Sequence, residues 1–125
     1  MSLATQSLLA LVALLHVYFL VLEMFLWDTP FGRKTFKLTA EFSAASKTLA
    51  ANQGLYNGFL ALGLLLGLLA GKRGFAFDLF FLICVVIAGI FGGFTVNRKI
   101  FFIQAVPAIA ALVFLYFDFV RVINE

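Results

Sequence analysis

Four long apolar stretches alternate with short polar ones along the chain. The apolar stretches cover residues 3–27, 52–71, 75–94 and 100–120. A helix needs about 20 residues to cross a bilayer, because each residue adds about 1.5 Å, so every stretch is long enough or nearly so. Trp27 closes the first stretch with the amphipathic ring that is typical of the headgroup level. The pattern predicts an all-α, four-helix bundle that spans a membrane.

The connections between these stretches differ in length. Residues 71–74 and 97–99 form tight basic turns, whereas residues 28–51 form one long connection. Pro30 ends the first helix, because the residue before a proline is driven out of the helical region. Phe42, Ala45 and Leu49 then share one apolar helix side. Over residues 31–51 we expect a short interfacial helix between the first two spans, or a cytoplasmic extension of the second span.

Composition agrees with a single membrane domain over residues 1–125. Hydrophobic residues make up 64% and charged residues 12% of the chain, and the mean hydropathy is +1.10. Globular proteins carry about 25% charged residues. The nine Lys and Arg residues lie between or beside the apolar stretches, which suits membrane lipid and leaves no basic surface for nucleic acid. A single Cys and a single His argue against a metal site, and no cofactor is implied.

The distribution of basic residues predicts the orientation. Six Lys and Arg residues fall on the side of the long connection and three on the side of both termini. Because cytoplasmic segments carry the excess, we expect the long connection in the cytoplasm and both termini outside a cell (inner) membrane. On the side of the termini, Asp78 and Asp118 lie within reach of Lys72, Arg73 and Arg121, so we expect structural ion pairs there.

A few polar residues inside the apolar stretches are the candidates for a functional site. Glu23, Asn57 and Gln104 lie four or five residues from one membrane face, at a depth of about 6–8 Å. His16 lies about 16 Å deep, two turns from Glu23 on the same helix stripe. Ionisable groups at such depth face the bundle interior. We expect a buried polar pocket beneath residues 28–51, with further binding candidates at Trp27, Glu41, Asn52, Gln53 and Tyr56.

These residues support three functions, which the sequence leaves open. In an intramembrane enzyme or binding protein for a lipophilic small molecule, His16 and Glu23 are the candidate acid–base pair. Tyr56, Asn57 and Gln104 then orient a polar group of the ligand. In a small proton-coupled transporter, His16 and Glu23 carry protons instead. In a non-catalytic accessory membrane subunit, the amides only join helices through hydrogen bonds.

Small residues mark the second span as a central helix. Gly54 and Gly58 lie on one helix face, and Gly63, Gly67 and Gly71 lie on the opposite one. Such small-xxx-small patterns let two helices approach closely. We expect packing on both faces of this helix, either within the chain or, through the second set of glycines, in a homo-oligomer.

Four motifs in order resemble those of a known family. They are Leu15-His16-Val17-Tyr18, Glu23-Met24-Phe25-Leu26-Trp27, the run from Asn52 to Ala61, and Gln104 ahead of Pro107-Ala108. Together they are similar to the small bacterial membrane proteins grouped as domain of unknown function 1304, and the resemblance covers essentially the whole chain. It implies an integral membrane protein of four helices, and it implies no activity.

Overall fold

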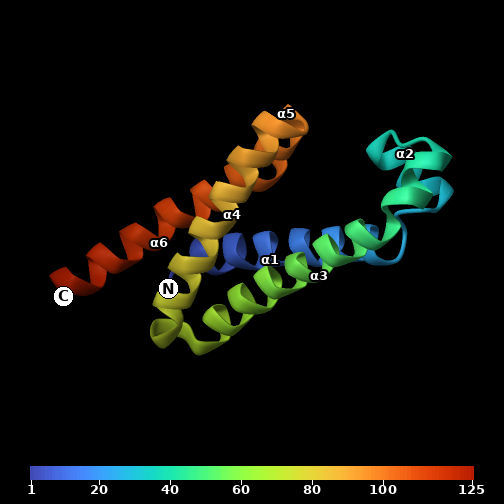
Figure 1. Cartoon of the computed structure of the whole chain (residues 1–125). Helices are drawn as coiled ribbons and strands as arrows, with labels where there is room; N and C mark the ends of the chain where they lie inside the picture. Colours follow the sequence, from blue (N-terminus) through green and yellow to red (C-terminus); the bar gives the residue numbers. More distant parts are fainter.

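The computed structural model describes all 125 residues, and nearly all of them are helical (Figure 1). The predicted all-α architecture is therefore confirmed. Along the chain the elements are α1 (Leu3–Met24), α2 (Pro30–Phe36), α3 (Ala40–Ala70), the 3-10 turn η1 (Gly71–Gly74), α4 (Phe75–Thr95), α5 (Arg98–Ile100), the π-helical turn η2 (Phe101–Ala105) and α6 (Val106–Asn124).

Three helical stretches are long and apolar enough to cross a membrane. They are Leu3–Met24, Ala40–Thr95 and Arg98–Asn124. The middle stretch has 56 residues and folds back on itself at the turn η1, so it contains the two helices α3 and α4 (Figure 1). A straight helix of that length would measure about 84 Å, far more than the roughly 30 Å of a hydrocarbon core.

Ser and Thr side chains cap the N-termini of α1, α2 and α3. The hydroxyls of Ser2, Thr29 and Thr39 accept hydrogen bonds from backbone N–H groups three residues later, at 3.3, 3.2 and 3.1 Å. These bonds satisfy donors that have no partner inside the helix. Pro30 follows Thr29 at the first helical position, where a missing N–H costs nothing. Lys37 ends α2 in the left-handed conformation, with φ of 55°.

The long connection contains both of the expected forms. α2 is the short helix between the first two spans, and α3 begins at Ala40, twelve residues before the apolar stretch that starts at residue 52. With 31 residues, α3 is about 46 Å long and exceeds the hydrocarbon core. Its first turns therefore extend beyond the span towards α2. α1 ends at Met24, slightly earlier than the predicted residue 27.

α3 is the central helix, with other helices packed on two faces. A Cβ atom on Gly54 would lie 2.7 Å from Cγ of Met24 and 3.1 Å from Cβ of Glu23, so α1 lies directly against the α3 backbone. On the opposite face, Gly63 is covered by the ring of Phe81 and Gly67 by the carboxyl of Asp78, both from α4.

The glycines of the predicted oligomer face have different uses within the chain. Gly63 and Gly67 both pack against α4, as just described. Gly71 has φ of +59° with open space around it, so it serves the turn η1. A homo-oligomer through these three positions stays a prediction.

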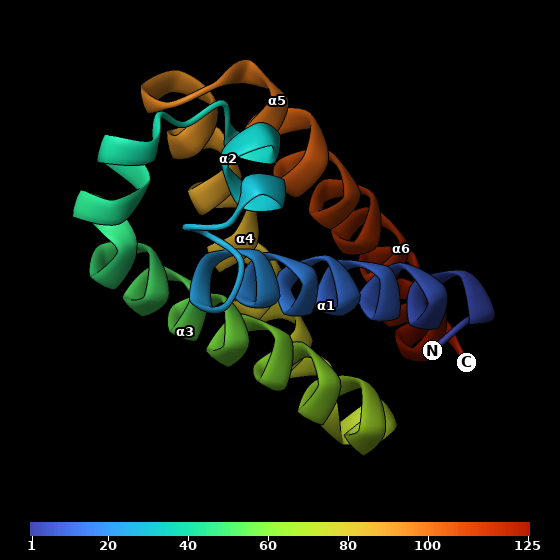
Figure 2. The same ribbon diagram turned by 90° about the vertical axis from the view of Figure 1, so that its right-hand side faces the viewer.

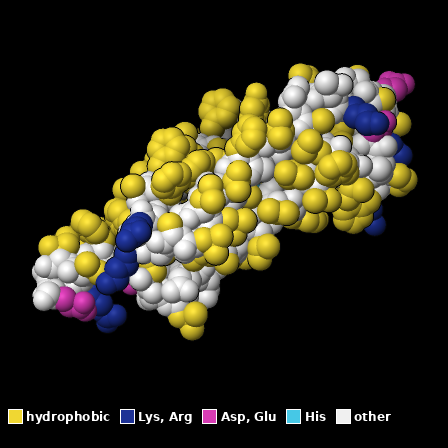
Figure 3. Space-filling view, turned by 90° about the horizontal axis from the view of Figure 1, so that it is seen from below, with side chains coloured by type: hydrophobic (Ala, Val, Ile, Leu, Met, Phe, Trp, Pro, Cys, Tyr) yellow, Lys and Arg dark blue, Asp and Glu magenta, His cyan; other side chains and the backbone are white.

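The surface of the molecule is largely apolar along its length. Figure 3 shows hydrophobic side chains across the middle of the face drawn, with charged side chains at its two ends. Large exposed side chains within the helices include Leu69 and Phe94, at 82% and 89% exposure. An apolar area of this extent is what a lipid-facing surface requires. The core beneath is small and aliphatic, and consists of Leu9, Val12, Ala13, Leu64, Leu82, Val85, Ala108, Ala111 and Leu115.

Both chain ends lie at the same end of the molecule (Figure 2). The backbone N–H of Ser2 donates to Oδ2 of Asp118 in α6 at 2.7 Å. The connection formed by α2 lies at the opposite end of α1. The chain therefore runs along the molecule an even number of times between its first and its last residue.

Candidate functional site

His16 is sealed inside the helix bundle and has a defined tautomer. The side chain is 1% exposed, and Nδ1 lies 2.8 Å from the backbone oxygen of Val12. A carbonyl oxygen can only accept, so Nδ1 carries the proton. Nε2 therefore has a free lone pair, which accepts from the amide Nε2 of Gln104 at 3.2 Å. The pair joins α1 to the π-helical turn η2.

The π-helical turn presents Gln104 to His16. In η2 the N–H of Val106 reaches back five residues to the carbonyl of Phe101, instead of the usual four. Pro107 follows and has no N–H to offer the carbonyl of Ile103 four residues earlier, which disfavours a regular α-helix here. Single π turns of this kind re-aim side chains and are frequent at functional sites.

Glu23 and Asn57 form the second buried polar pair. Nδ2 of Asn57 donates to Oε1 of Glu23 at 2.9 Å, which joins α1 to α3. Asn57 is 5% exposed, whereas Glu23 is only partly buried. Oε2 of Glu23 has no partner in the protein and reaches the molecular surface. Gly54, less than one turn before Asn57, lets the two helices come close enough for this bond.

Other predicted site residues face outward from α3. Asn52, Gln53 and Tyr56 are all exposed, Tyr56 at 59%. Gln53 is one helical turn before Asn57, and Tyr56 is three residues after Gln53, so these side chains flank one side of the helix. Gly54 touches Glu23, which places the whole group at the depth of that carboxyl. We call Glu23, Gln53, Tyr56 and Asn57 the outer polar edge.

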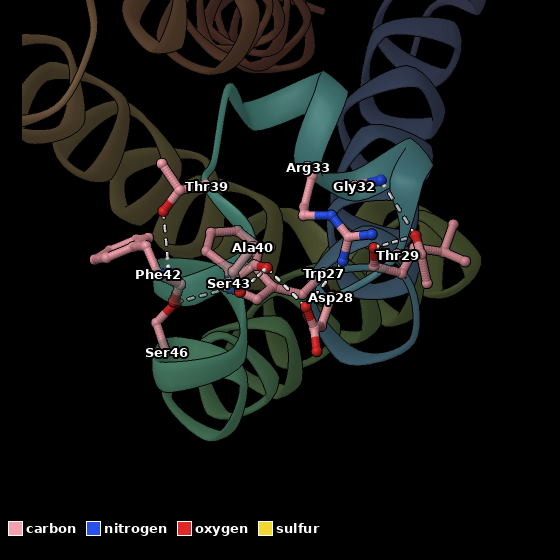
Figure 4. A network of polar contacts seen from close by, with 11 residues as sticks. Trp27, Asp28, Thr29, Gly32, Arg33, Thr39, Ala40, Phe42, Ser43 and Ser46 are labelled. Atoms are coloured by element: carbon pink, nitrogen blue, oxygen red, sulfur yellow. Dashed lines mark hydrogen bonds and ion pairs between the residues drawn. The ribbon is translucent and has the colours of Figure 1, made fainter.

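A network of polar contacts holds the long connection to the end of α1 (Figure 4). The indole N–H of Trp27 donates to the Ser46 hydroxyl at 2.9 Å. Oδ1 of Asp28 accepts from the Ser43 hydroxyl at 2.7 Å and from the Arg33 guanidinium at 3.0 Å. The hydrogen bond from Ser43 is the main cause that lowers the pKa of Asp28 below its ordinary value of 3.8, and Arg33 adds to it.

The predicted site residues do not all converge. His16 and Glu23 are seven residues apart on α1, about 10 Å along the axis, and no hydrogen bond joins them. Glu41 is exposed and makes no hydrogen bond or ion pair. Two hollows lie at the other end of the molecule, between α4 and α6, and none of the predicted site residues lines them.

The expected ion pairs of Asp78 and Asp118 are wrong. Oδ2 of Asp118 accepts from the Ser2 backbone and hydroxyl and from the Thr5 hydroxyl, at 2.7, 3.1 and 2.6 Å. Asp78 is fully buried against Gly67, and neither carboxyl oxygen has a partner. The reason is the tight turn η1, which directs its two basic side chains into the surroundings, while α4 turns Asp78 towards α3. The positions of Asp78 and Asp118 along their helices indicate their depth but not the groups that surround their carboxyls.

These features define a class: small all-α proteins whose helices can cross a membrane and which hold two polar pairs between those helices. Within that class, the chain belongs to the family described as protein of unknown function (DUF1304), whose model matches residues 10–116. The resemblance seen in the sequence motifs is thereby confirmed. The matched range contains both hydrogen-bonded pairs.

A relative from the curated proteins matches along almost the whole chain. It is the "Uncharacterized protein YpaA" of Lactococcus lactis subsp. lactis (strain IL1403), which is 32% identical over 119 residues. The match covers 94% of this chain and 100% of the relative. No solved structure matches the chain.

Proposed function

We propose that this chain is a four-pass protein of the cell membrane that binds a lipophilic small molecule carrying a polar group. Glu23 and Asn57 are the recognition pair, and Gln53 and Tyr56 are the neighbouring polar contacts. The long connection lies on the cytoplasmic side, in line with its excess of basic residues. The observation that carries the proposal is the free Oε2 of Glu23 at the molecular surface.

The position of this oxygen is costly without a ligand. Glu23 lies in the last turn of α1, four residues before Trp27, whose ring is typical of the headgroup level. Carboxyl groups are rare within membrane-spanning helices and usually serve a substrate, a proton or a partner. A hydroxyl or amine of a ligand in the bilayer can donate to Oε2, while the exposed amide of Gln53 and the phenol of Tyr56 offer further hydrogen bonds. The ligand therefore approaches from the lipid, through the side of the α1–α3 contact.

His16 takes a positioning role in this proposal rather than a chemical one. Its imidazole is 1% exposed and both nitrogens already have partners. Acid–base catalysis by His16 and Glu23 as a pair has no support, because about 10 Å of helix separates them. A proton path through the protein has none either, since the fully buried Leu9, Val12 and Ala13 lie between His16 and the polar groups near the termini.

A second candidate is the non-catalytic accessory subunit. One observation favours it: each of the two polar pairs joins α1 to a different element, the π-helical turn η2 in one case and α3 in the other. Hydrogen bonds between membrane helices contribute about 0.6–2 kcal/mol each, which is enough to fix helix positions. In that function Glu23 only anchors Asn57, and the outer polar edge meets another membrane protein.

Two substitutions of Glu23 separate these candidates. Glu23→Gln keeps the volume and the acceptor for Asn57 but removes the charge, whereas Glu23→Leu leaves Asn57 buried without its partner. For the ligand-binding function, Glu23→Gln lowers the amount of lipophilic small molecule that co-purifies with the protein by about tenfold, the worth of one charge-assisted hydrogen bond. The thermal midpoint stays unchanged. Mass spectrometry of organic extracts from purified protein measures the first quantity.

Glu41→Gln is the matched control, because Glu41 is an exposed carboxyl in the first turn of α3 with no partner. It should leave both the extract and the midpoint as in the wild type. The accessory function predicts a different pattern: Glu23→Gln is silent in both measurements, and Glu23→Leu lowers the midpoint sharply. That pattern would contradict the ligand-binding proposal.

A further inference from the structure

Two adjoining hollows lie between α4 and α6, at the end of the molecule that carries the termini. The first has a volume of about 340 Å³, and its lining is entirely apolar or aromatic, including Leu79 and Leu112. The second has about 270 Å³ and is also lined by Lys72 and Asp118. Both hollows share Phe75, Leu115 and Phe119, so they adjoin, and we call them together the groove. Volumes of about 300 Å³ and more are typical of small-molecule sites.

The groove is polar at the membrane surface and apolar deeper in. Lys72 lies in the turn η1, whereas Leu79 lies four residues into α4, about 6 Å beyond Phe75. Asp118 lies near the end of α6, and Leu112 precedes it by six residues, about 9 Å. The stacked rings of Phe75 and Phe119, with centroids 4.9 Å apart, line both parts. This order of polar and apolar parts matches the headgroup and acyl chain of a phospholipid.

The charged groups of the groove are the ammonium of Lys72, the carboxylate of Asp118 and the N-terminal ammonium of Met1, which also lines the second hollow. Lys72 is exposed and forms no ion pair, since the ion pair of the structure joins Arg33 to Asp28. The three hydrogen bonds to Asp118 all go to Oδ2, so Oδ1 stays free at the surface. The two ammonium groups can hold a phosphate and the free carboxylate oxygen can accept from an ammonium, so the groove suits a headgroup that carries both.

We propose that this groove binds a phospholipid whose headgroup carries both a phosphate and a primary ammonium, the ethanolamine class. The phosphate lies at Lys72, which acts as a point charge for it. The primary ammonium donates to Oδ1 of Asp118, and one acyl chain fills the apolar hollow beside Leu79. The site is independent of Glu23, which lies near the opposite face of the membrane.

The headgroup preference follows from the same two contacts. A choline headgroup has the phosphate but no N–H group, so it loses the bond to Asp118. A glycerol headgroup carries a net negative charge and brings no cation to that carboxylate. The three phospholipids with identical acyl chains therefore differ only in the contact that the proposal assigns to Asp118.

Native mass spectrometry of the purified, detergent-solubilised full chain tests the site with these three lipids. The wild type should retain the ethanolamine lipid about tenfold better than the choline or glycerol lipid, as expected for one charge-assisted hydrogen bond. Lys72→Gln should lower retention of the ethanolamine lipid by a similar factor. Arg73→Gln is the matched control: it removes the next basic residue of the same turn, which does not line the groove. It should bind as the wild type does.

Filling the apolar hollow tests the acyl-chain part. Leu79 is partly exposed in the groove, so Leu79→Phe should fit without disturbing the core and should lower retention of all three lipids. The proposal is overturned if the wild type retains the three lipids equally. It is also overturned if the Lys72→Gln variant retains the ethanolamine lipid as well as the wild type does. Preference for the glycerol lipid overturns the assignment of the ammonium to Asp118. Lys72 is exposed in a turn, so its variant keeps the test valid even if Leu79→Phe does not fold.

Discussion

Asp78 is a fully buried carboxyl whose two oxygens have no hydrogen-bond partner. It packs against Gly67 of α3, in the first turn of α4. Burial of a polar group without a partner costs about 1–3 kcal/mol, and more if the group is charged. His16 and Asn57 are buried to a similar degree, but each has a partner on another helix. Among the buried polar residues, Asp78 is thus the one that destabilises the packing around it.

Asp78→Thr should therefore raise the thermal midpoint of the detergent-solubilised protein. Threonine is of similar size, and its hydroxyl can bond the carbonyl of Gly74 four residues earlier, which relieves the missing hydrogen bond. The gain should be on the order of 1–3 kcal/mol. A lower midpoint for this variant would instead mean that the Asp78 carboxyl has a stabilising partner within the membrane.

At the scale of single residues, the sequence predicts how deep a side chain lies better than it predicts the side of the helix on which it lies. Glu23 and Asn57 were expected at one level, and they are hydrogen-bonded, because the rise per residue of a helix is fixed. Tyr56 was expected at the same level but inside, and it is 59% exposed. Its direction depends on how α3 is rotated against α1, which is set by the contact of Gly54 with Glu23. Periodicity was too weak to fix that rotation, since apolar residues surround the helix on all sides.

At the scale of elements, the connection between α1 and α3 depends on a small set of polar contacts. Asp28 joins α2 through Arg33 and the start of α3 through Ser43. Trp27 adds a hydrogen bond to Ser46 and packs against the ring of Phe36, with centroids 4.8 Å apart. Few apolar side chains are buried here, so these contacts decide whether α2 stays in place.

Acid should release this connection at a pH set by Asp28. Because its pKa is lower in the folded protein than its ordinary 3.8, the carboxylate contributes stability that is fully present above that value. The contribution is lost as the pH falls below 3.8 and through the folded-state pKa. Trp27 is the single Trp of the chain, so its fluorescence should report the change below about pH 4. Asp28→Asn should lack this transition, and an unchanged acid transition in that variant would refute the assignment.

The boundaries of α3 illustrate what hydropathy does and does not predict. The apolar stretch from residue 52 marks where the helix can enter a membrane, but the helix itself begins at Ala40. Thr39 provides the N-terminal cap there, and the Ala-rich sequence that follows favours a helix in water as well as in lipid. The π turn that carries Gln104 was also missed, although Pro107 was the signal for a local departure from the α-helix.

At the scale of the whole molecule, the packing of the helices places two polar sites at opposite ends. The outer polar edge lies near the connection formed by α2, and the groove of Lys72 and Asp118 lies near the termini. Between them is the apolar core of Leu9, Val12 and neighbouring residues. The up-and-down order of the helices was predictable from the sequence, because four apolar stretches and two tight turns leave few arrangements. The groove was not, because it depends on how α4 and α6 separate at their ends.

Both proposed sites depend on one claim, that the chain crosses the membrane four times with both termini outside. Single cysteines at Ser2, Lys34 and Asn124, each in a Cys84→Ser background, test it with a membrane-impermeant thiol reagent on intact cells. Ser2→Cys and Asn124→Cys should both react, whereas Lys34→Cys should react only after the membrane is opened. Opposite accessibility of the two termini would contradict four passes, and reaction of Lys34→Cys alone would reverse the orientation.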